Sequence, residues 1–295
     1  MMKMIKAVSL LLLLACTGQL FAAPEGWSPL LEPSELNTIL SRSDEVRVIT
    51  VTGDYTAGHI PGSVHAPYSS FRGPQTNAGQ LPAIDSLTAL VQQLGIAADT
   101  PVAIVHQGNS DVDMGASTRV YWTLKSLGVQ DLAVLNGGFA AWQAAELPVS
   151  TDATVVAASD FVPVWSEQYT VHTAEVEQLV ANNTARLIDG RPASFFEGSQ
   201  ASAARAGTIK GAENLSFASF FNQTSMKPSG ELSSILQAAS ISDEQLTVAF
   251  CNTGQMGSIN WFVMSELQGM NNVKLYAESI VEWAQSPDRP MDNEP

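Results

Sequence analysis

An internal repeat constrains the fold of this chain more than any other feature of its sequence. Three segments of the first half recur in the same order in the second half, at spacings of 149, 145 and 141 residues. The matching segments are 57–63 with 206–212, 102–106 with 247–251, and 132–142 with 273–283. Spacings that shrink gradually while the order is kept are expected of two copies that differ by small loop insertions. The sequence therefore predicts two tandem domains, at residues 27–148 and 170–287.

Each copy alternates short apolar segments with segments of helical periodicity. The predicted strands are residues 48–51, 102–105, 132–135, 187–188, 248–250 and 273–276. The predicted helices are residues 87–94, 116–127, 174–180 and 258–267, and three of them are followed within two residues by glycine. This alternation predicts an α/β fold in which each domain has a mostly parallel sheet flanked by helices. Ligands are then expected at the carboxyl ends of the strands.

The first 22 residues have the composition of a secretory signal peptide. Lys3 and Lys6 flank an apolar run at residues 7–14, and small residues follow up to Ala22. The run is too short to span a bilayer, so we expect export to the periplasm after cleavage at Ala22. An alternative is a lipoprotein signal with Cys16 lipidated and kept as an anchor, although a larger residue than usual stands two positions before it. No later segment is apolar enough to predict a membrane span.

Two further segments fall outside the repeat. Residues 149–169 are rich in Ser, Thr, Ala and Val and lack a helical period, which is typical of an interdomain linker with some extended structure. Residues 288–295 carry two prolines and three acids, and we expect them to be a poorly ordered tail.

Composition and charge exclude several classes of function. Lys and Arg total 14 against 29 Asp and Glu, a formal net charge of −15. Nucleic acid would therefore be repelled over most of the surface. The four histidines and two cysteines show no spacing typical of metal ligands, and a cleaved chain would keep one cysteine, which excludes a disulfide framework. We expect no nucleic-acid partner, no metal and no cofactor.

Cys251 is the leading candidate for a catalytic residue. It ends a predicted buried strand and precedes residues 252–257, a tight loop with two glycines that leads into a predicted helix. Such a turn directs backbone N–H groups and the positive end of the helix dipole at the sulfur, which favours a nucleophilic thiolate. The alternative is that Cys251 is a small buried hydrophobic residue without a chemical role.

The residues after Cys251 separate the possible chemistries. A cysteine phosphatase needs an arginine six positions after its cysteine, where this chain has Gly257. A thiol redox protein of the thioredoxin type needs a second cysteine nearby, and residues 252–254 supply none. The chemistry that remains is a lone thiolate that carries a single atom or group, such as sulfane sulfur held as a persulfide.

These motifs together resemble the rhodanese-like sulfurtransferases, specifically the two-domain thiosulfate and 3-mercaptopyruvate sulfurtransferases. The resemblance covers nearly all of the chain after the signal peptide. The segments that carry it are residues 58–63, 135–142, 189–191, 251–254 and 276–283. It implies two tandem rhodanese-like domains of which only the second is catalytic.

The first copy has His106 at the position that Cys251 occupies in the second. The loop that follows is four residues longer than its counterpart and carries Asp111 and Asp113, whose carboxylates would repel an anionic donor. We therefore interpret His106 as structural or vestigial and the first domain as non-catalytic, with partner binding as an alternative for that domain.

The resemblance also implies roles for individual residues. Cys251 would take sulfane sulfur from a small anionic donor, thiosulfate or 3-mercaptopyruvate, and pass it from a persulfide to a thiol, cyanide or protein acceptor. Arg191 would meet the donor or tie the loop to the sheet, and an ion pair with Asp189 is the alternative. The candidate substrate-binding residues are Arg191, Asn252, Thr253, Gly254, Gln255, Met256 and Gly257. The loop amides would stabilise the charge on sulfur, and Thr253 would donate its hydroxyl to it or serve as an ordinary turn residue.

The loop leaves the donor open, because residues 252–257 carry no charge. Thiosulfate-using members tend to have basic residues there and mercaptopyruvate-using members small neutral ones, and this loop fits neither pattern. A non-catalytic persulfide carrier, or a binding module for a partner protein, is the alternative to an enzyme. Multiple turnover with a small acceptor would separate the two.

Overall fold

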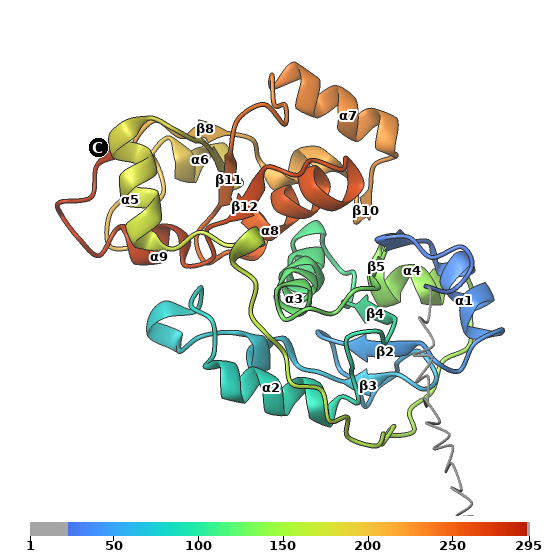
Figure 1. The fold of residues 1–295 in the computed structure, drawn as a ribbon. Helices are drawn as coiled ribbons and strands as arrows, with labels where there is room; N and C mark the ends of the chain where they lie inside the picture. Colours follow the sequence, from blue (N-terminus) through green and yellow to red (C-terminus); the bar gives the residue numbers. More distant parts are fainter. Residues whose placement is uncertain (1–22, 294–295) are drawn as a thin grey trace, which may run out of the picture.

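The computed structural model describes residues 23–293. The predicted signal peptide, residues 1–22, and the alternative lipid anchor at Cys16 lie outside the described residues. Figure 1 shows two α/β units that meet where helix α3 (Met114–Ser126) packs against helix α8 (Gln255–Phe262). Within residues 23–293, no helix combines the length and the hydropathy that a membrane crossing requires.

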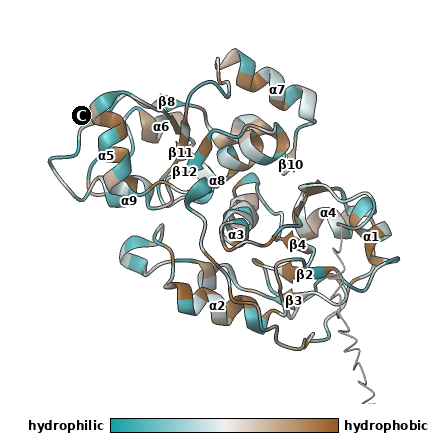
Figure 2. Ribbon diagram, viewed as in Figure 1, coloured by the Kyte–Doolittle hydropathy of each residue, from teal (hydrophilic) through white to brown (hydrophobic). Residues whose placement is uncertain are grey.

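The first domain is built on a five-stranded parallel sheet with the strand order β1-β5-β4-β2-β3. Its central strands are buried and mostly apolar (Figure 2), as parallel strands covered on both faces must be. The strands are β1 (Leu30–Leu31), β2 (Arg47–Thr50), β3 (Val64–His65), β4 (Val102–Val105) and β5 (Leu132–Leu135). The helices are α1 (Pro33–Leu40), α2 (Ile84–Gln93), α3 and α4 (Gly138–Ala144), with 3-10 turns at Tyr68–Phe71, Gln75–Asn77 and Asp111–Asp113.

The second domain repeats this plan with a four-stranded parallel sheet in the order β12-β11-β6-β8. Its strands are β6 (Arg186–Asp189), β8 (Glu213–Asn214), β11 (Thr247–Phe250) and β12 (Val273–Leu275). Its helices are α5 (Thr173–Asn182), α6 (Ala193–Phe196), α7 (Ser229–Ala238), α8 and α9 (Ser279–Trp283), with 3-10 turns at Glu167–Tyr169 and Phe217–Phe220 and a π-helical turn at Val263–Leu267. Two small antiparallel pairs complete it: β9 (Phe221–Asn222) with β10 (Ser225–Met226), and β7 (Thr208–Ile209) with β13 (Met291–Asp292).

The predicted fold class is confirmed, with a parallel sheet flanked by helices in each domain. All six predicted strands are present, and their ends differ from the prediction by at most one residue. The helix predicted at residues 258–267 begins three residues earlier, at Gln255, because Gly254 adopts a left-handed conformation (φ +74°) that ends the preceding turn. It continues into the π-helical turn up to Leu267.

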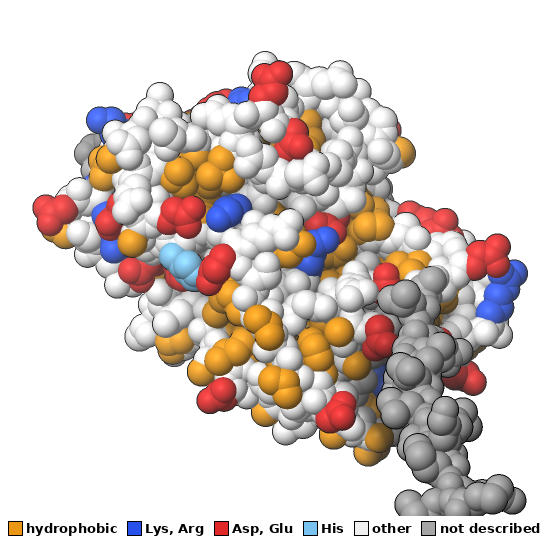
Figure 3. All heavy atoms as spheres, in the orientation of Figure 1, with side chains coloured by type: hydrophobic (Ala, Val, Ile, Leu, Met, Phe, Trp, Pro, Cys, Tyr) orange, Lys and Arg blue, Asp and Glu red, His pale blue; other side chains and the backbone are white. Residues whose placement is uncertain are grey.

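The segment between the domains is hydrogen bonded to the first domain along its length. Ser159 donates to the Ile96 carbonyl (2.6 Å), and the Ser166 amide donates to the Ser126 carbonyl (2.7 Å). Apolar side chains gather over α2 and this segment in Figure 3. Val155 and Val162 of the segment are exposed. The segment therefore runs as an extended strap along the first domain.

The expectation of a poorly ordered tail is wrong for residues 288–293. Met291 and Asp292 form strand β13, which pairs with β7. Asp292 accepts a hydrogen bond from the Gly211 amide (2.7 Å), and Asn293 donates to the Phe196 carbonyl (3.0 Å). These long-range backbone partners, which the polar and proline-rich local sequence does not reveal, hold the segment in place.

The two domains share a packed interface centred on α3 and α8. One continuous hydrophobic cluster contains buried residues of both domains, including Trp122 of α3 and Trp261 of α8. Polar contacts accompany it: Thr118 and Ser258 share a hydroxyl hydrogen bond of 2.8 Å, and Glu266 accepts from Tyr121 at 2.7 Å. The carboxyl ends of the second sheet therefore lie next to residues of the first domain.

Candidate active site

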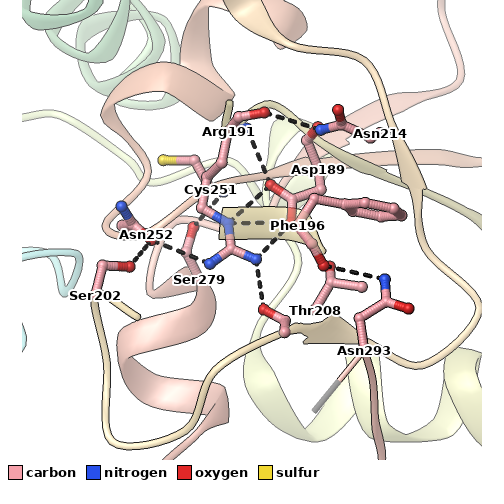
Figure 4. Close-up of polar contacts among 11 residues, drawn as sticks. Asp189, Arg191, Phe196, Ser202, Thr208, Asn214, Cys251, Asn252, Ser279 and Asn293 are labelled. Atoms are coloured by element: carbon pink, nitrogen blue, oxygen red, sulfur yellow. Dashed lines mark hydrogen bonds and ion pairs between the residues drawn. The ribbon is translucent and has the colours of Figure 1, made fainter. Parts of the chain in front are cut away.

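Cys251 directly follows β11, which lies between β12 and β6 in the second sheet. Its side chain is fully buried. Its amide donates to Ser279 Oγ (3.1 Å), and its carbonyl accepts from the Ile280 amide (3.1 Å). Figure 4 shows this cysteine close to Asn252 and Arg191. The predicted position at the carboxyl end of a buried strand is confirmed.

Two glycines make the tight turn from Cys251 into α8 possible. A Cβ atom at Gly254 would overlap Arg119 Nη1 and lie 2.5 Å from the Ala277 carbonyl oxygen. A Cβ atom at Gly257 would lie 2.8 Å from the carbonyl carbon of Phe250, the last residue of β11. Only glycine fits at either position without displacing backbone, so the loop is held close to both the strand and the first domain.

The amides of residues 252–257 are available to an anion. None of them donates a hydrogen bond to another group in the part of the chain that the structure describes, and the first bond of helical type is Ser258 N–H to the Gly254 carbonyl at 3.3 Å. The first N–H groups of a helix have no partner within it and carry the positive end of its dipole. The turn can therefore stabilise negative charge at its centre.

Arg191 forms the ion pair with Asp189 that was the alternative to donor binding. Its Nε lies 3.0 Å from both carboxylate oxygens, and its Nη2 donates to Asp189 Oδ2 (2.6 Å) and to the Gly207 carbonyl (2.7 Å). Asp189 Oδ2 also accepts from Thr208 Oγ1 at 2.8 Å (Figure 4). The remaining nitrogen, Nη1, donates to Asn252 Oδ1 at 3.3 Å. Arg191 thereby links β6 to the first residue of the loop.

The other predicted loop residues point in different directions. Asn252 Oδ1 also accepts from Ser202, and Thr253 is partly exposed. Gln255 Nε2 donates to the Val112 carbonyl of the first domain (3.3 Å), and Met256 packs against the shared hydrophobic cluster. The loop thus joins the predicted residues in one turn, while two of its side chains are engaged at the domain interface.

Ser279 is a residue of this site that the sequence reasoning missed. Its hydroxyl accepts from the Cys251 amide and donates to the Tyr276 carbonyl (2.8 Å), and its φ of +56° is unusual for a residue other than glycine. The matching position of the first copy is Gly138, also with positive φ. The available signal in the sequence was that a glycine stands in one copy at the position where the other copy has a serine, which indicates an unusual backbone conformation there.

Arg119 of α3 is a second residue that was missed. It is fully buried, donates to the Gly79 carbonyl (2.8 Å) and the Ala277 carbonyl (3.5 Å), and lies against Gly254 of the loop. Burial lowers the pKa of Arg119 to about 10, the nearby charge of Arg72 acts in the same direction, and the Glu278 carboxylate acts in the opposite one. No local signal in the sequence links an arginine of the first domain to a loop more than a hundred residues away.

The surroundings of His106 fit a structural role. The side chain is buried, its Nδ1 lies 3.2 Å from Ser117 Oγ, and its Nε2 has no partner in the described part of the chain. Burial lowers the pKa of His106 to about 4, so the imidazole is neutral at neutral pH. Gly138 packs so closely that a Cβ atom there would lie 2.9 Å from the ring. The ring stands directly after β4, at the position that corresponds to Cys251 directly after β11.

The structure offers no metal site within residues 23–293, where no group of three or more His, Cys, Asp or Glu side chains is suitably placed. It also leaves Cys251 without exposed surface.

Comparison with known proteins places this arrangement in a family. The family model for the rhodanese-like domain matches the chain twice, at residues 33–145 and 172–286. The 3-mercaptopyruvate sulfurtransferase of Escherichia coli K12 is 26% identical over 248 residues, which cover 82% of this chain and 86% of that protein. The thiosulfate sulfurtransferase of Azotobacter vinelandii is 27% identical over 268 residues, which cover 89% and 96%.

A solved structure shares the fold. The crystal structure of the E. coli 3-mercaptopyruvate sulfotransferase SseA superposes with a TM-score of 0.75 at 22% identity, covering 85% of this chain and 98% of that one. Two α/β domains with a cysteine loop in the second match the two-domain sulfurtransferases that the chain resembles in sequence. The chain belongs to the rhodanese family, in the class of the thiosulfate and 3-mercaptopyruvate sulfurtransferases.

Proposed function

We propose that this sulfurtransferase moves sulfane sulfur from a small anionic donor to a nucleophilic acceptor through a persulfide on Cys251. The observation that carries the proposal is the turn around this cysteine, which follows β11 and keeps the amides of residues 252–257 free of protein acceptors. Fixed N–H groups of this kind stabilise an anionic sulfur without reorganisation during the reaction.

The first half-reaction is a displacement at sulfur. The Cys251 thiolate attacks the outer sulfur of the donor, a sulfur–sulfur bond forms, and the donor's bond to that sulfur breaks with its electron pair on the leaving group. With thiosulfate the leaving group is sulfite. With 3-mercaptopyruvate the carbon–sulfur bond breaks, and the thiol proton ends on the methyl carbon of pyruvate.

The second half-reaction returns the enzyme to its starting state. A thiolate of a small or protein acceptor, or cyanide, attacks the outer sulfur of the persulfide and forms the new bond to it. Cys251 leaves as the thiolate with the electron pair of the broken sulfur–sulfur bond. The chain's own residues hold negative charge on sulfur in both steps, so no cofactor is needed for this proposal.

We assign Arg191 to the positioning of the loop. Asp189 and the Gly207 carbonyl take its Nε and Nη2, and its contact with the loop is made to Asn252. A guanidinium that is 1% exposed and paired in this way is poorly placed to bind a donor.

The intact mass of the protein after exposure to each donor tests the proposal, with Cys251→Ser as the matched control. The expected result is the gain of one sulfur atom with thiosulfate, with 3-mercaptopyruvate or with both, its absence in the control, and its removal by cyanide with release of thiocyanate. Failure of a folded protein to gain sulfur from either donor would overturn the proposal. Sulfur gain without multiple turnover would instead indicate the persulfide carrier.

We also propose that the protein is exported to the periplasm, on the basis of the basic and apolar composition of residues 1–22. Mass spectrometry of the protein from a periplasmic fraction tests this. A mature chain that begins at Ala23 is the expected result, and a lipid-modified chain that begins at Cys16 would establish the anchored alternative. A full-length chain in the cytoplasm would refute both.

A further inference from the structure

Positive charge reaches the Cys251 loop from the first domain. The loop itself is uncharged, and Arg191 is paired with Asp189. Arg119 of α3, by contrast, lies directly against Gly254 and donates to the Ala277 carbonyl beside the loop. The segment of the first domain at Gly79 packs on the same turn, since a Cβ atom there would lie 2.5 Å from the Ala277 oxygen.

Arg119 is a buried cation without a carboxylate partner. Its side chain is fully buried, its Nε has no hydrogen-bond partner, and no ion pair joins it to an acid among residues 23–293. Glu278 is the acid whose charge reaches it: its Oε1 lies 3.6 Å from His172 Nδ1, and its buried Oε2 has no hydrogen-bond partner. A buried charge is costly unless something opposite compensates it. The anionic sulfur of Cys251 is the group that the reaction brings there.

A second arginine, Arg72, directly follows the 3-10 turn Tyr68–Phe71, which packs against α3. Arg72 donates to the Tyr68 hydroxyl, and its guanidinium lies 5.0 Å from the centre of the Tyr68 ring. Burial raises the pKa of Tyr68, while the charges of Arg72 and Arg119 lower it and that of Cys251 raises it. The hydroxyl therefore keeps its proton. Arg72 is half-buried and has no acidic partner in the described part of the chain, so its remaining donors are available.

We propose that Tyr68, Arg72 and Arg119 form an anion-recognition cluster by which the first domain completes the site around Cys251. Arg119 compensates the negative charge on the sulfur of Cys251, and Arg72, held by Tyr68, binds the anionic group of the donor, a sulfonate-like oxyanion or a carboxylate. This inference rests on the proposed sulfur transfer and adds its donor-recognition residues. It also explains how a chain with a net charge of −15 and an uncharged loop can accept an anionic donor.

The role of Arg119 is tested by the pH dependence of Cys251 alkylation with iodoacetamide, a neutral reagent, followed by mass. Arg119→Met is expected to raise the pH midpoint of alkylation by about 1 unit or more, because loss of an adjacent positive charge disfavours the thiolate. Arg119→Lys keeps the charge, so its midpoint should lie close to that of the wild type. Thermal unfolding shows whether each variant is folded. A folded Arg119→Met variant with the wild-type midpoint would overturn the role of Arg119. If Arg119→Met does not fold, Arg119→Gln, which also removes the charge, is measured in its place and decides in the same way.

The role of Arg72 is tested by steady-state kinetics with thiosulfate and, separately, with 3-mercaptopyruvate. Arg72→Gln is expected to raise KM about tenfold or more for the donor that loads the wild type, the loss of one charge-assisted contact, while the alkylation midpoint stays within a few tenths of a unit. Arg42→Gln is the control, because Arg42 is exposed and lines, with Glu25, a pocket that no residue of the Cys251 loop lines. An unchanged KM in Arg72→Gln would refute donor binding by the cluster.

These outcomes are separable from failure of the proposed function. If the wild type gains no sulfur from either donor, sulfur transfer is refuted, whereas the alkylation profiles still report whether Arg119 acts on Cys251. If the wild type gains sulfur and the variants match it in both assays, only the cluster is refuted.

Discussion

Replacement of Gly254 by alanine should lower the free energy of unfolding by more than the left-handed backbone at this position alone would cause. Gly254 has φ +74°, and a side chain in this left-handed region costs about 1–2 kcal/mol. The added Cβ atom would also overlap Arg119 Nη1 and lie 2.5 Å from the Ala277 oxygen, and overpacking of this kind costs about 1–3 kcal/mol. The free energy of unfolding should therefore fall by about 2–5 kcal/mol.

A matched control isolates the steric part. Gly211 lies in the same domain with φ +77°, and no atom lies within 4 Å of a Cβ placed there. Gly211→Ala should lose only the conformational part, about 1–2 kcal/mol. Urea unfolding of both variants, followed by tryptophan fluorescence, gives the two free energies. Equal losses within about 0.5 kcal/mol would show that the loop does not press against Arg119 and would refute the reasoning.

Three other perturbations test the site at different points. Asp189→Asn should cost about 3–5 kcal/mol in urea unfolding, because it leaves the Arg191 guanidinium buried without its carboxylate. Ser279→Ala should cost about 1–3 kcal/mol and slow sulfur loading, because the Cys251 amide loses its acceptor. The free energy of unfolding should also fall by about 3 kcal/mol as the pH drops from about 6.5 to 4. The reason is that His106 has a pKa of about 4 in the folded protein and therefore binds a proton more readily in the unfolded chain. His106→Asn should flatten that dependence.

Each of these predictions has a result that would contradict it. An Asp189→Asn variant as stable as Glu213→Gln, which breaks the more exposed ion pair with Arg186, would show that burial does not matter at β6. A Ser279→Ala variant that loads sulfur at the wild-type rate would remove the hydroxyl from the site. An unfolding free energy of His106→Asn that falls with pH as steeply as that of the wild type would assign the dependence to other groups.

The repeat and the apolar strands were sufficient to predict the fold and the position of Cys251. Buried parallel strands are apolar throughout, so β4 and β11 stand out from their surroundings without any knowledge of their neighbours. The cysteine then follows from its place directly after β11. The buried strands and the position of Cys251 depend on the local sequence, so the local sequence is sufficient to predict them.

Features that depend on distant partners could not be found in this way. The polar tail becomes strand β13 because β7 supplies backbone partners from another part of the domain. Ser279 reaches the Cys251 amide from a turn 28 residues away. Arg119 reads locally as one more residue of an amphipathic helix, and its burial against Gly254 follows from the packing of α3 on α8.

The first domain, which has no cysteine at the position of the nucleophile, contributes to the site through the shared interface. His106 stands at the position of the nucleophile there, and Gly138 packs closely against its ring. Helix α3, which follows His106 in the chain, is nevertheless almost entirely buried. It packs against α8, the helix that follows Cys251. Whatever side chain α3 presents at its centre is therefore held beside the cysteine loop of the other copy. An arginine there acts on the sulfur at low dielectric, where a charge has far more effect than on a solvated surface. The duplication thus supplies a fixed cation that the uncharged loop does not contain.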